Sequence, residues 1–325
     1  MATPIFAVLA ALAAAALFAA ASAVGNGYVF FAGYVVLQYV VLATGWNILG
    51  GYMGYVNFGT AGFFALGAYC TVALGKLAPL PVPVFMLAGG LVSGIVGLLM
   101  GYLTLRLRGA FFAIATLAMA VVLQTLIVNW DFVGGASGAY VMRPAHAPIL
   151  GTDYVRYLCV LMLGLAVLAI TLARAIERSR IGYGFAAIRD DEVSAEAAGV
   201  PTLRLKLFGA TLSGALMGMA GAPFPYYVTY LDPASAFGLG YAVNGVAMPL
   251  VGGTAAWPGP LIGAILLGTL QQLATVTISS ALNLLIVGLV LVGFVVAAPN
   301  GILGLFRRRP AAHDASRRRF LRLRI

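Results

Sequence analysis

The sequence predicts an all-α, polytopic integral membrane protein with its N- and C-termini in the cytoplasm. Of its 325 residues, 62% are hydrophobic and only 9% are charged. A soluble domain of this size needs a largely polar surface, which this composition cannot supply. The apolar runs are about 20 residues long, which is the length of a helix that crosses a bilayer. They do not alternate as the strands of a membrane β-barrel do.

The apolar runs, taken in order, predict about ten transmembrane helices. The first covers residues 5–24 and ends in Ala21-Ser22-Ala23, which resembles a signal-peptidase site. Because no basic residue precedes this run and it is long, a retained first helix is favoured over a cleaved signal. The later spans are expected at residues 28–50, 58–76, 84–105, 110–130, 155–173, 207–228, 241–256, 259–279 and 282–298. The short run 241–256 contains Pro249, so it either crosses the membrane or re-enters.

Charge gives this count of spans a test. If residues 174–206 are cytoplasmic, sixteen of the nineteen Lys and Arg residues fall on the cytoplasmic side, which is the positive-inside pattern. They are the eight of the tail, six from Arg174 to Lys206, and Arg106 with Arg108. The tail, residues 306–325, is expected to orient the protein and attract anionic lipid rather than nucleic acid.

Residues 178–206 form the one long polar stretch in the apolar chain. Asp190 and Asp191 are good helix N-caps, while Gly199 and Pro201 are typical of a helix stop. A short helix is therefore expected at roughly 191–198, with Glu192 and Glu196 one turn apart. A turn around Gly184–Ile188 is a candidate for a second helix. Composition alone leaves two readings open, namely a helix that lies in a partner's groove and a solvated loop that orients the protein.

The same stretch resembles the cytoplasmic coupling loop of ABC importer permeases. It is more narrowly similar to the high-affinity branched-chain amino-acid permease family, of the LivH/LivM type and closer to LivM. The motifs are Ala187–Glu192, Glu196–Val200 and Lys206; Asn47–Gly54, Asn57–Gly59 and Ala65–Tyr69; Leu107–Ala118, Asn129-Trp130 and Gly134–Gly138; and Val251–Gly253, Gly259-Pro260 and Gly263. Each motif is weak alone, but the four groups occur in order over roughly residues 28–305. The broader ABC loop places its glycine several residues after Glu-Ala-Ala, whereas here Gly199 follows at once.

This resemblance implies the permease subunit of an ABC importer in the inner membrane, and not an enzyme. The implied partners are a sister permease, two cytoplasmic ATP-binding subunits that hold ATP and Mg, and a periplasmic solute-binding protein. This chain would bind no cofactor itself. Residues 1–305 would form the permease domain, with 174–206 as its cytoplasmic coupling loop. The residues implied in ATPase coupling are Arg189, Asp190, Asp191, Glu192, Glu196, Ala197 and Gly199. The implied substrate is a branched-chain amino acid, with urea or an amide as the alternative within the same family.

The sequence lacks the groups with which a transporter would drive transport itself, which agrees with energy supplied by a partner. No Gly-x-x-x-x-Gly-Lys-Ser/Thr loop occurs, and the expected spans hold essentially no Asp, Glu, Lys, Arg or His. An ion-coupled secondary transporter, the alternative from another class, commonly places such groups at mid-membrane. A membrane enzyme would need an acid–base pair. No Cys/His cluster predicts a metal site.

A substrate would therefore meet neutral polar groups and the ends of broken helices. The candidates for the substrate path are Asn47, Gly50, Gly51, Gly54, Asn57, Thr116, Asn244, Gly252, Gly253 and Asn283. The alternative is that these amides bond helices to each other and these glycines allow close packing. The tryptophans near span ends, Trp46, Trp130 and Trp257, are expected to be interfacial anchors.

Overall fold

The structure is a computed structural model that describes residues 3–23, 26–104, 107, 109–144, 153–277, 288–289, 292–293 and 301–306. Within these ranges, nine helical segments are long and apolar enough to cross a membrane, which confirms the polytopic all-α prediction. The long helices are α1 (Thr3–Ala23), α2 (Gly27–Met53), α3 (Thr60–Leu77), α4 (Val82–Thr104), α5 (Ala110–Val128), α6 (Tyr154–Glu177), α9 (Thr202–Gly221), α12 (Leu239–Gly252) and α13 (Pro258–Thr277).

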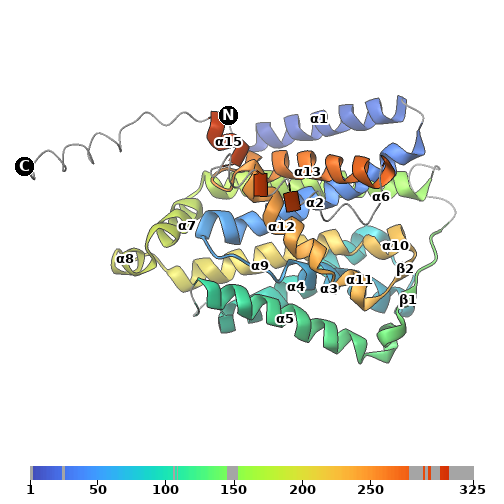
Figure 1. Cartoon of the computed structure of the whole chain (residues 1–325), viewed down its shortest axis with the longest axis horizontal. Helices are drawn as coiled ribbons and strands as arrows, with labels where there is room; N and C mark the ends of the chain where they lie inside the picture. Colours follow the sequence, from blue (N-terminus) through green and yellow to red (C-terminus); the bar gives the residue numbers. More distant parts are fainter. Residues whose placement is uncertain are drawn as a thin grey trace, which may run out of the picture.

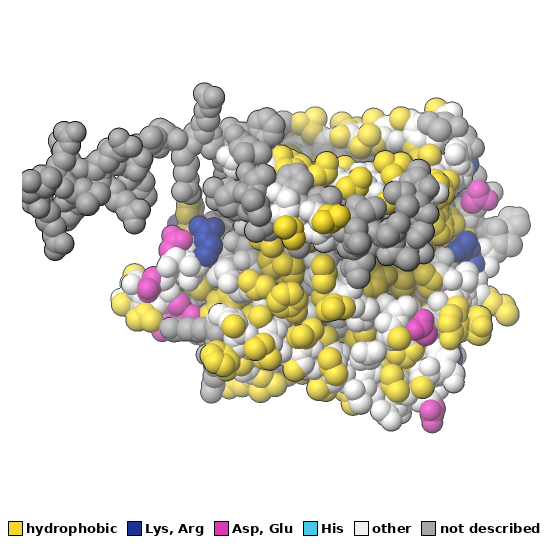
Figure 2. Space-filling view, in the orientation of Figure 1, with side chains coloured by type: hydrophobic (Ala, Val, Ile, Leu, Met, Phe, Trp, Pro, Cys, Tyr) yellow, Lys and Arg dark blue, Asp and Glu magenta, His cyan; other side chains and the backbone are white. Residues whose placement is uncertain are grey.

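The bundle has two distinct ends, seen at the left and right of Figure 1. At one end lie α7 (Arg180–Asp190) and α8 (Glu192–Ala197), and this is called the α7/α8 end. At the other, called the β end, β1 (Ala139–Tyr140) pairs antiparallel with β2 (Tyr230–Leu231). In the face shown by Figure 2, charged side chains gather at these two ends, with an apolar band between them. That distribution suits a body surrounded by lipid.

The short elements complete the connections. They are the 3-10 turns η1 (Asp131–Val133) and η2 (Gly135–Ser137), and the helices α10 (Phe224–Val228), α11 (Pro233–Ala236) and α15 (Gly301–Phe306). The α1 helix begins at the α7/α8 end, because Phe6 packs edge-on against Trp257 in the turn before α13. The α15 helix also starts there, since Gly301 lies against Gly253.

Small residues allow the central helices to pack closely. A Cβ atom on Gly67 of α3 would lie 1.9 Å from the carbonyl oxygen of Gly218 on α9. A Cβ on Gly97 of α4 would lie 2.7 Å from the carbonyl oxygen of Ala210 on α9. In lipid, where no hydrophobic force drives helices together, such backbone contact is a main source of helix association. Glycine at these positions therefore holds α3, α4 and α9 together.

The run 241–256, which the sequence left as crossing or re-entrant, falls largely within residues 233–252, a segment that runs between the two ends. It starts at α11, directly after β2 at the β end. It finishes where Asn47, near the end of α2, donates a hydrogen bond of 3.2 Å to the carbonyl of Thr254. The return into α13 is tight, because a Cβ on Gly252 would lie 1.8 Å from the carbonyl oxygen of Gly259.

Two expected span boundaries were wrong, and the difference matters for charge. The α6 helix continues to Glu177 instead of ending near residue 173, and α9 begins at Thr202 instead of 207. Arg174 and Lys206 therefore belong to the ends of long helices, and they are buried, with 6% and 4% of their surface exposed. The prediction that the spans hold essentially no ionisable groups is therefore wrong at their α7/α8 ends. Residues 282–298 (apart from the helical 288–289 and 292–293), Asn283, Arg106, Arg108 and the tail 307–325 lie outside the described residues.

Candidate functional site

The α7–α8 hairpin is built by local capping, as the sequence predicted. Asp191 is extended between the two helices, and its carboxylate accepts a hydrogen bond of 2.6 Å from the backbone N–H of Ser194. This satisfies one of the free N–H groups at the start of α8. The predicted helix at 191–198 is confirmed as α8. The expected turn at Gly184–Ile188 is the middle of a longer helix, α7, whose N-cap is Ser179.

Glycine ends α8 for a backbone reason. Gly199 has φ of +84°, in the left-handed region that favours glycine, and its N–H donates to the carbonyl of Glu196. The next N–H, of Val200, donates to the carbonyl of Ala195. A Cβ on Gly199 would meet nothing within 4 Å. The glycine is thus required by the turn and leaves an open surface beside it.

The two faces of α8 differ in what they contact. On the inner face Ala195 is buried, and the carboxylates of Glu192 and Glu196 bond to side chains of α9. On the outer face Val193 is 58% exposed. Ala197 and Gly199 are also exposed, as are Arg189 and Asp190, whose side chains pair at 3.5 Å. The seven predicted coupling residues are therefore adjacent, but they do not share one surface.

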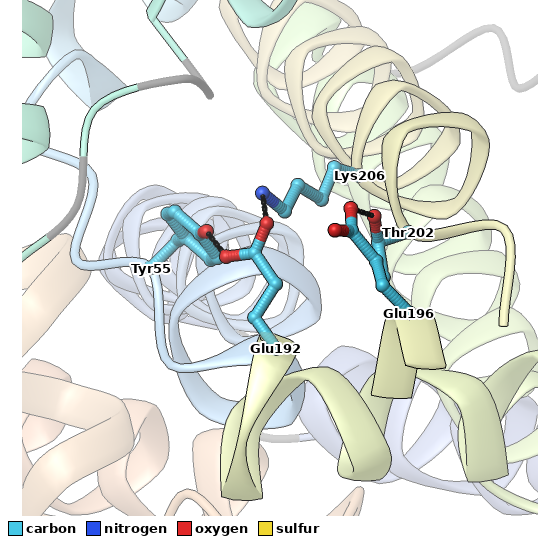
Figure 3. A network of polar contacts seen from close by, with 5 residues as sticks. All are labelled: Tyr55, Glu192, Glu196, Thr202 and Lys206. Carbon is cyan, nitrogen blue, oxygen red and sulfur yellow. Dashed lines mark hydrogen bonds and ion pairs between the residues drawn. The ribbon is translucent and has the colours of Figure 1, made fainter. Parts of the chain in front are cut away.

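The inner face holds a polar network that joins three segments of the chain (Figure 3). Lys206 of α9 forms an ion pair with Glu192, whose other carboxylate oxygen accepts a 2.6 Å hydrogen bond from the hydroxyl of Tyr55. The hydroxyl of Thr202, at the start of α9, donates to Glu196. Tyr55 was not among the predicted site residues, because nothing in the sequence relates it to Glu192, 137 positions later.

Tyr55 belongs to the connection between α2 and α3, residues 54–59, which is called the 54–59 loop and in which Tyr55, Asn57 and Gly59 are buried. Its ring packs edge-on against Phe112 of α5, with ring centres 5.1 Å apart. Asn57 accepts a 2.7 Å hydrogen bond from the N–H of Gly59, and the N–H of Phe58 donates to the hydroxyl of Thr116 at 3.0 Å. The predicted residues Asn57 and Thr116 thus shape this loop.

Trp46 ties the loop to α2. It is only 2% exposed, and its indole N–H donates to the carbonyl of Asn57 at 2.7 Å. The prediction that Trp46 is an interfacial anchor is therefore wrong. Gly50 is needed beside it, since a Cβ there would lie 2.5 Å from the indole ring. Gly54, with φ of +79°, ends α2 and faces Arg189 of α7.

The other predicted path residues form two separate groups. Asn47, Gly51, Gly252 and Gly253 meet at the turn between α12 and α13, where a Cβ on Gly51 would lie 2.0 Å from the side-chain oxygen of Asn47. Asn244 lies elsewhere, donating to the hydroxyl of Tyr39 at 3.2 Å and accepting from the amide of Gln271 at 2.8 Å. The described candidates are therefore engaged in hydrogen bonds and close contacts that hold helices and turns.

The α6 helix reaches the same turn through residues that the sequence did not single out. The carboxylate of Glu177 accepts a 2.6 Å hydrogen bond from the N–H of Trp257 and a longer one, 3.5 Å, from the hydroxyl of Tyr52. These contacts connect the end of α6, directly before α7, to α2 and to the start of α13. No local pattern could have identified them, because the three residues are far apart in the sequence.

Comparison with known proteins agrees with this architecture. Residues 28–295 match the family described as "Branched-chain amino acid transport system / permease component". The chain is 27% identical over 293 residues to the high-affinity branched-chain amino acid transport system permease protein LivM of Salmonella typhimurium, covering 83% of this chain and 68% of that one. The LivM protein of Escherichia coli gives the same identity and coverage. A probable LivH permease of Methanocaldococcus jannaschii is 26% identical over 266 residues, 77% of this chain and 83% of its own. No solved structure matches the chain.

Proposed function

The chain belongs to the family of branched-chain amino acid transport permeases, and we propose that it is the inner-membrane permease subunit of an ABC importer for a branched-chain amino acid. The observation that carries this proposal is the α7–α8 hairpin. It is a pair of short helices, each capped by a side chain, at one end of an apolar bundle, with an exposed outer face and an inner face bonded to the spans. Such a hairpin suits a partner that supplies motion to the bundle from outside it.

The orientation follows from charge. We place the α7/α8 end in the cytoplasm, because Arg174, Arg178, Arg180, Arg189, Arg204 and Lys206 all lie at or next to it. The start of α1 and the start of α15 lie at the same end, through Phe6 and Gly301. Both termini are then cytoplasmic. The β end would face the periplasm, where a solute-binding protein delivers its ligand.

The partner at the α7/α8 end would be an ATP-binding subunit with a groove for the hairpin. Tyr183 of α7, which is 74% exposed, and Val193 on the outer face of α8 are available as apolar anchors. Ala197 and Gly199 have little or no side chain, so the wall of a groove can approach α8 closely there. Two such subunits, one on this chain and one on a sister permease, would bind ATP with Mg.

Reconstitution tests the proposal. The chain would be incorporated into proteoliposomes with its sister permease and the two ATP-binding subunits, and uptake of leucine, isoleucine and valine measured with the solute-binding protein outside. We expect uptake that requires ATP inside the vesicles and the binding protein outside. Uptake by this chain alone, driven by an ion gradient without ATP, would overturn the proposal.

The substrate is tested separately by ligand binding to the partner solute-binding protein. A panel of branched-chain amino acids, small amino acids, urea and acetamide would be measured by calorimetry. Tightest binding of a branched-chain amino acid is expected. Tightest binding of urea or acetamide would keep the ABC importer but change its cargo.

A further inference from the structure

We infer that Glu192 is a positioning residue that fastens α8 to the membrane-spanning helices, so that a force on the outer face of α8 moves α9 and the 54–59 loop with it. This inference rests on the proposed function and deepens it. It assigns to Glu192, Lys206 and Tyr55 a role inside the permease, distinct from contact with the ATP-binding subunit. The geometry in Figure 3 carries it.

The central contact is a buried ion pair. Only 5% of the Lys206 side chain and 13% of the Glu192 side chain are exposed. The ammonium of Lys206 also lies 4.9 Å from the centre of the Tyr55 ring, and the Tyr55 hydroxyl bonds the same carboxylate. Each charge is therefore compensated by the other members. Removing one partner leaves a buried charge uncompensated, which is far more disruptive than loss of an exposed pair.

A second attachment lies one turn further along α8. The Glu196 carboxylate accepts a hydrogen bond from the hydroxyl of Thr202, the first residue of α9, and Ala195 between the two glutamates is buried. Two side chains a turn apart on one helix hold both its position and its rotation. Because both reach α9, the six-residue helix α8 is held to α9 as one piece.

From Tyr55 the contact continues into the bundle. The Tyr55 ring meets Phe112 of α5, and the loop that carries Tyr55 bonds to Thr116 of α5 and Trp46 of α2. A displacement of Glu192 is thus applied to α9 through Lys206 and to α2 and α5 through Tyr55. The outer face of α8, with Val193, is free to meet the partner, so binding and transmission use different residues of the same helix.

The experiment separates binding from transmission. Glu192→Gln, Lys206→Met and the exchanged pair Glu192→Lys with Lys206→Glu would be prepared in the full complex, in proteoliposomes with leucine and its binding protein. A matched control is Asp153→Asn, which removes the charge of a carboxylate that lies 4.0 Å from Arg156 and whose side chain is 77% exposed. Three quantities are measured: ATP-binding subunit retained per permease, ATP hydrolysis, and leucine uptake.

We expect each single variant to retain the ATP-binding subunit within about twofold of the unaltered chain, and to raise the ATP hydrolysed per leucine about tenfold. In the exchanged pair opposite charges again face each other. The ATP hydrolysed per leucine should therefore be at least about threefold lower than in the single variants. The control should keep its ratio within about twofold. An unchanged ratio in the single variants overturns the inference, as does loss of the ATP-binding subunit in step with uptake.

Tyr55→Phe keeps the inference testable if the charge variants fail to insert. It retains both charges and the ring, and removes only the hydroxyl that bonds Glu192. A ratio raised about threefold supports transmission through the 54–59 loop, and an unaltered ratio contradicts it. Failure of the unaltered chain to bind any ATP-binding subunit would instead contradict the proposed function, so the two failures are distinguishable.

Discussion

The guanidinium of Arg174 lies 3.8 Å from the centre of the Phe6 ring, a cation–π contact that joins α1 to the end of α6. Phe6 also packs against Trp257, with ring centres 4.9 Å apart. Along the rest of α1, Ala14 is the one buried residue within the described range, and Phe18 packs against Phe30 of α2. The position of the first helix at the α7/α8 end therefore depends on this aromatic and cationic cluster.

Replacing Phe6 with Ala should loosen α1 without unfolding the bundle. A desolvated cation–π pair is worth about 2 kcal/mol. Loss of the ring would also remove a side chain that shields the Arg174 guanidinium. We expect increased labelling of cysteines introduced along α1, with little change in the thermal unfolding of the remainder. Leu12→Ala is the matched control, since Leu12 is 60% exposed. Equal labelling in both variants would show that α1 is held by other contacts.

Val193→Asp should weaken the partner's docking and leave the chain stable. Val193 is 58% exposed, so the change should alter the free energy of unfolding by less than about 0.5 kcal/mol. Placing a charge in an apolar groove should weaken binding of the ATP-binding subunit about tenfold, measured by titration in detergent. Met142→Asp, at a residue 92% exposed near the β end, serves as control. Undiminished binding would mean that the groove lies elsewhere.

A bulky residue at Gly199 should also abolish docking while the chain stays inserted. Such a substitution also strains the turn, so the two effects must be measured separately. The φ of +84° makes any other L-residue cost about 1–2 kcal/mol in the turn. Gly199→Ala therefore measures that backbone cost, and Gly199→Trp adds bulk on the open side. We expect the Trp variant to bind the ATP-binding subunit much more weakly than the Ala variant. Equal binding by both would contradict a groove at this position.

Substitutions of the neighbouring residues Asp190 and Asp191 should differ sharply in their effect on the stability of α8. Asp191→Ala removes the N-cap of α8 and should cost about 1 kcal/mol, which is enough to fray a helix of two turns. Asp190→Ala breaks an exposed contact with Arg189 that is worth about 0–1 kcal/mol. Hydrogen exchange of residues 192–197 should rise in the first variant and not in the second. The same exchange in both would mean that Asp191 does not hold α8.

Asn57→Leu should impair transport more than assembly. The substitution removes the acceptor for the N–H of Gly59 in the 54–59 loop, while the helix–helix contacts of the bundle stay intact. Asn57→Asp keeps an acceptor at this position and should restore much of the uptake. Asn244→Leu is the contrast, since it leaves Tyr39 and Gln271 without their partner and should lower the yield of inserted protein. If Asn57→Leu also fails to assemble, that amide is structural.

At the β end, the stability that Asp232 contributes should depend on pH, and the direction of the change follows from its pKa. Hydrogen bonds from Ser235 hold the pKa of this carboxyl below its ordinary value. Its contribution to stability is then present above the unfolded pKa of about 3.9 and is lost as pH falls through the lower folded pKa. Proteolysis near α11 should increase in that acid range and stay constant from about pH 5 to 8. Asp232→Asn should remove the dependence, and an unchanged acid response would assign it to another group.

Local patterns determined much of the fold. Apolar runs of spanning length located the nine described long helices within a few residues, because lipid forces the backbone of each to bond within itself. The start and stop of α8 were equally local, since a cap and a left-handed glycine act on their own turn. The boundaries of α6 and α9 were wrong because Arg174 and Lys206 looked like loop residues. Lys206 instead pairs with Glu192, and Arg174 lies against the rings of Phe6 and Trp257, partners that the sequence does not place beside them.

The sequence by itself therefore determined an apolar helical body, its polar hairpin and its family, because these depend on composition and on residues close together in the chain. Only the tertiary structure decided that Glu192 faces Lys206 and Tyr55, that Trp46 is buried, and that residues 233–252 run from one end to the other. Those facts depend on which helices meet. That choice is made by backbone contact at small residues such as Gly67 and Gly252, whose partners no sequence spacing reveals.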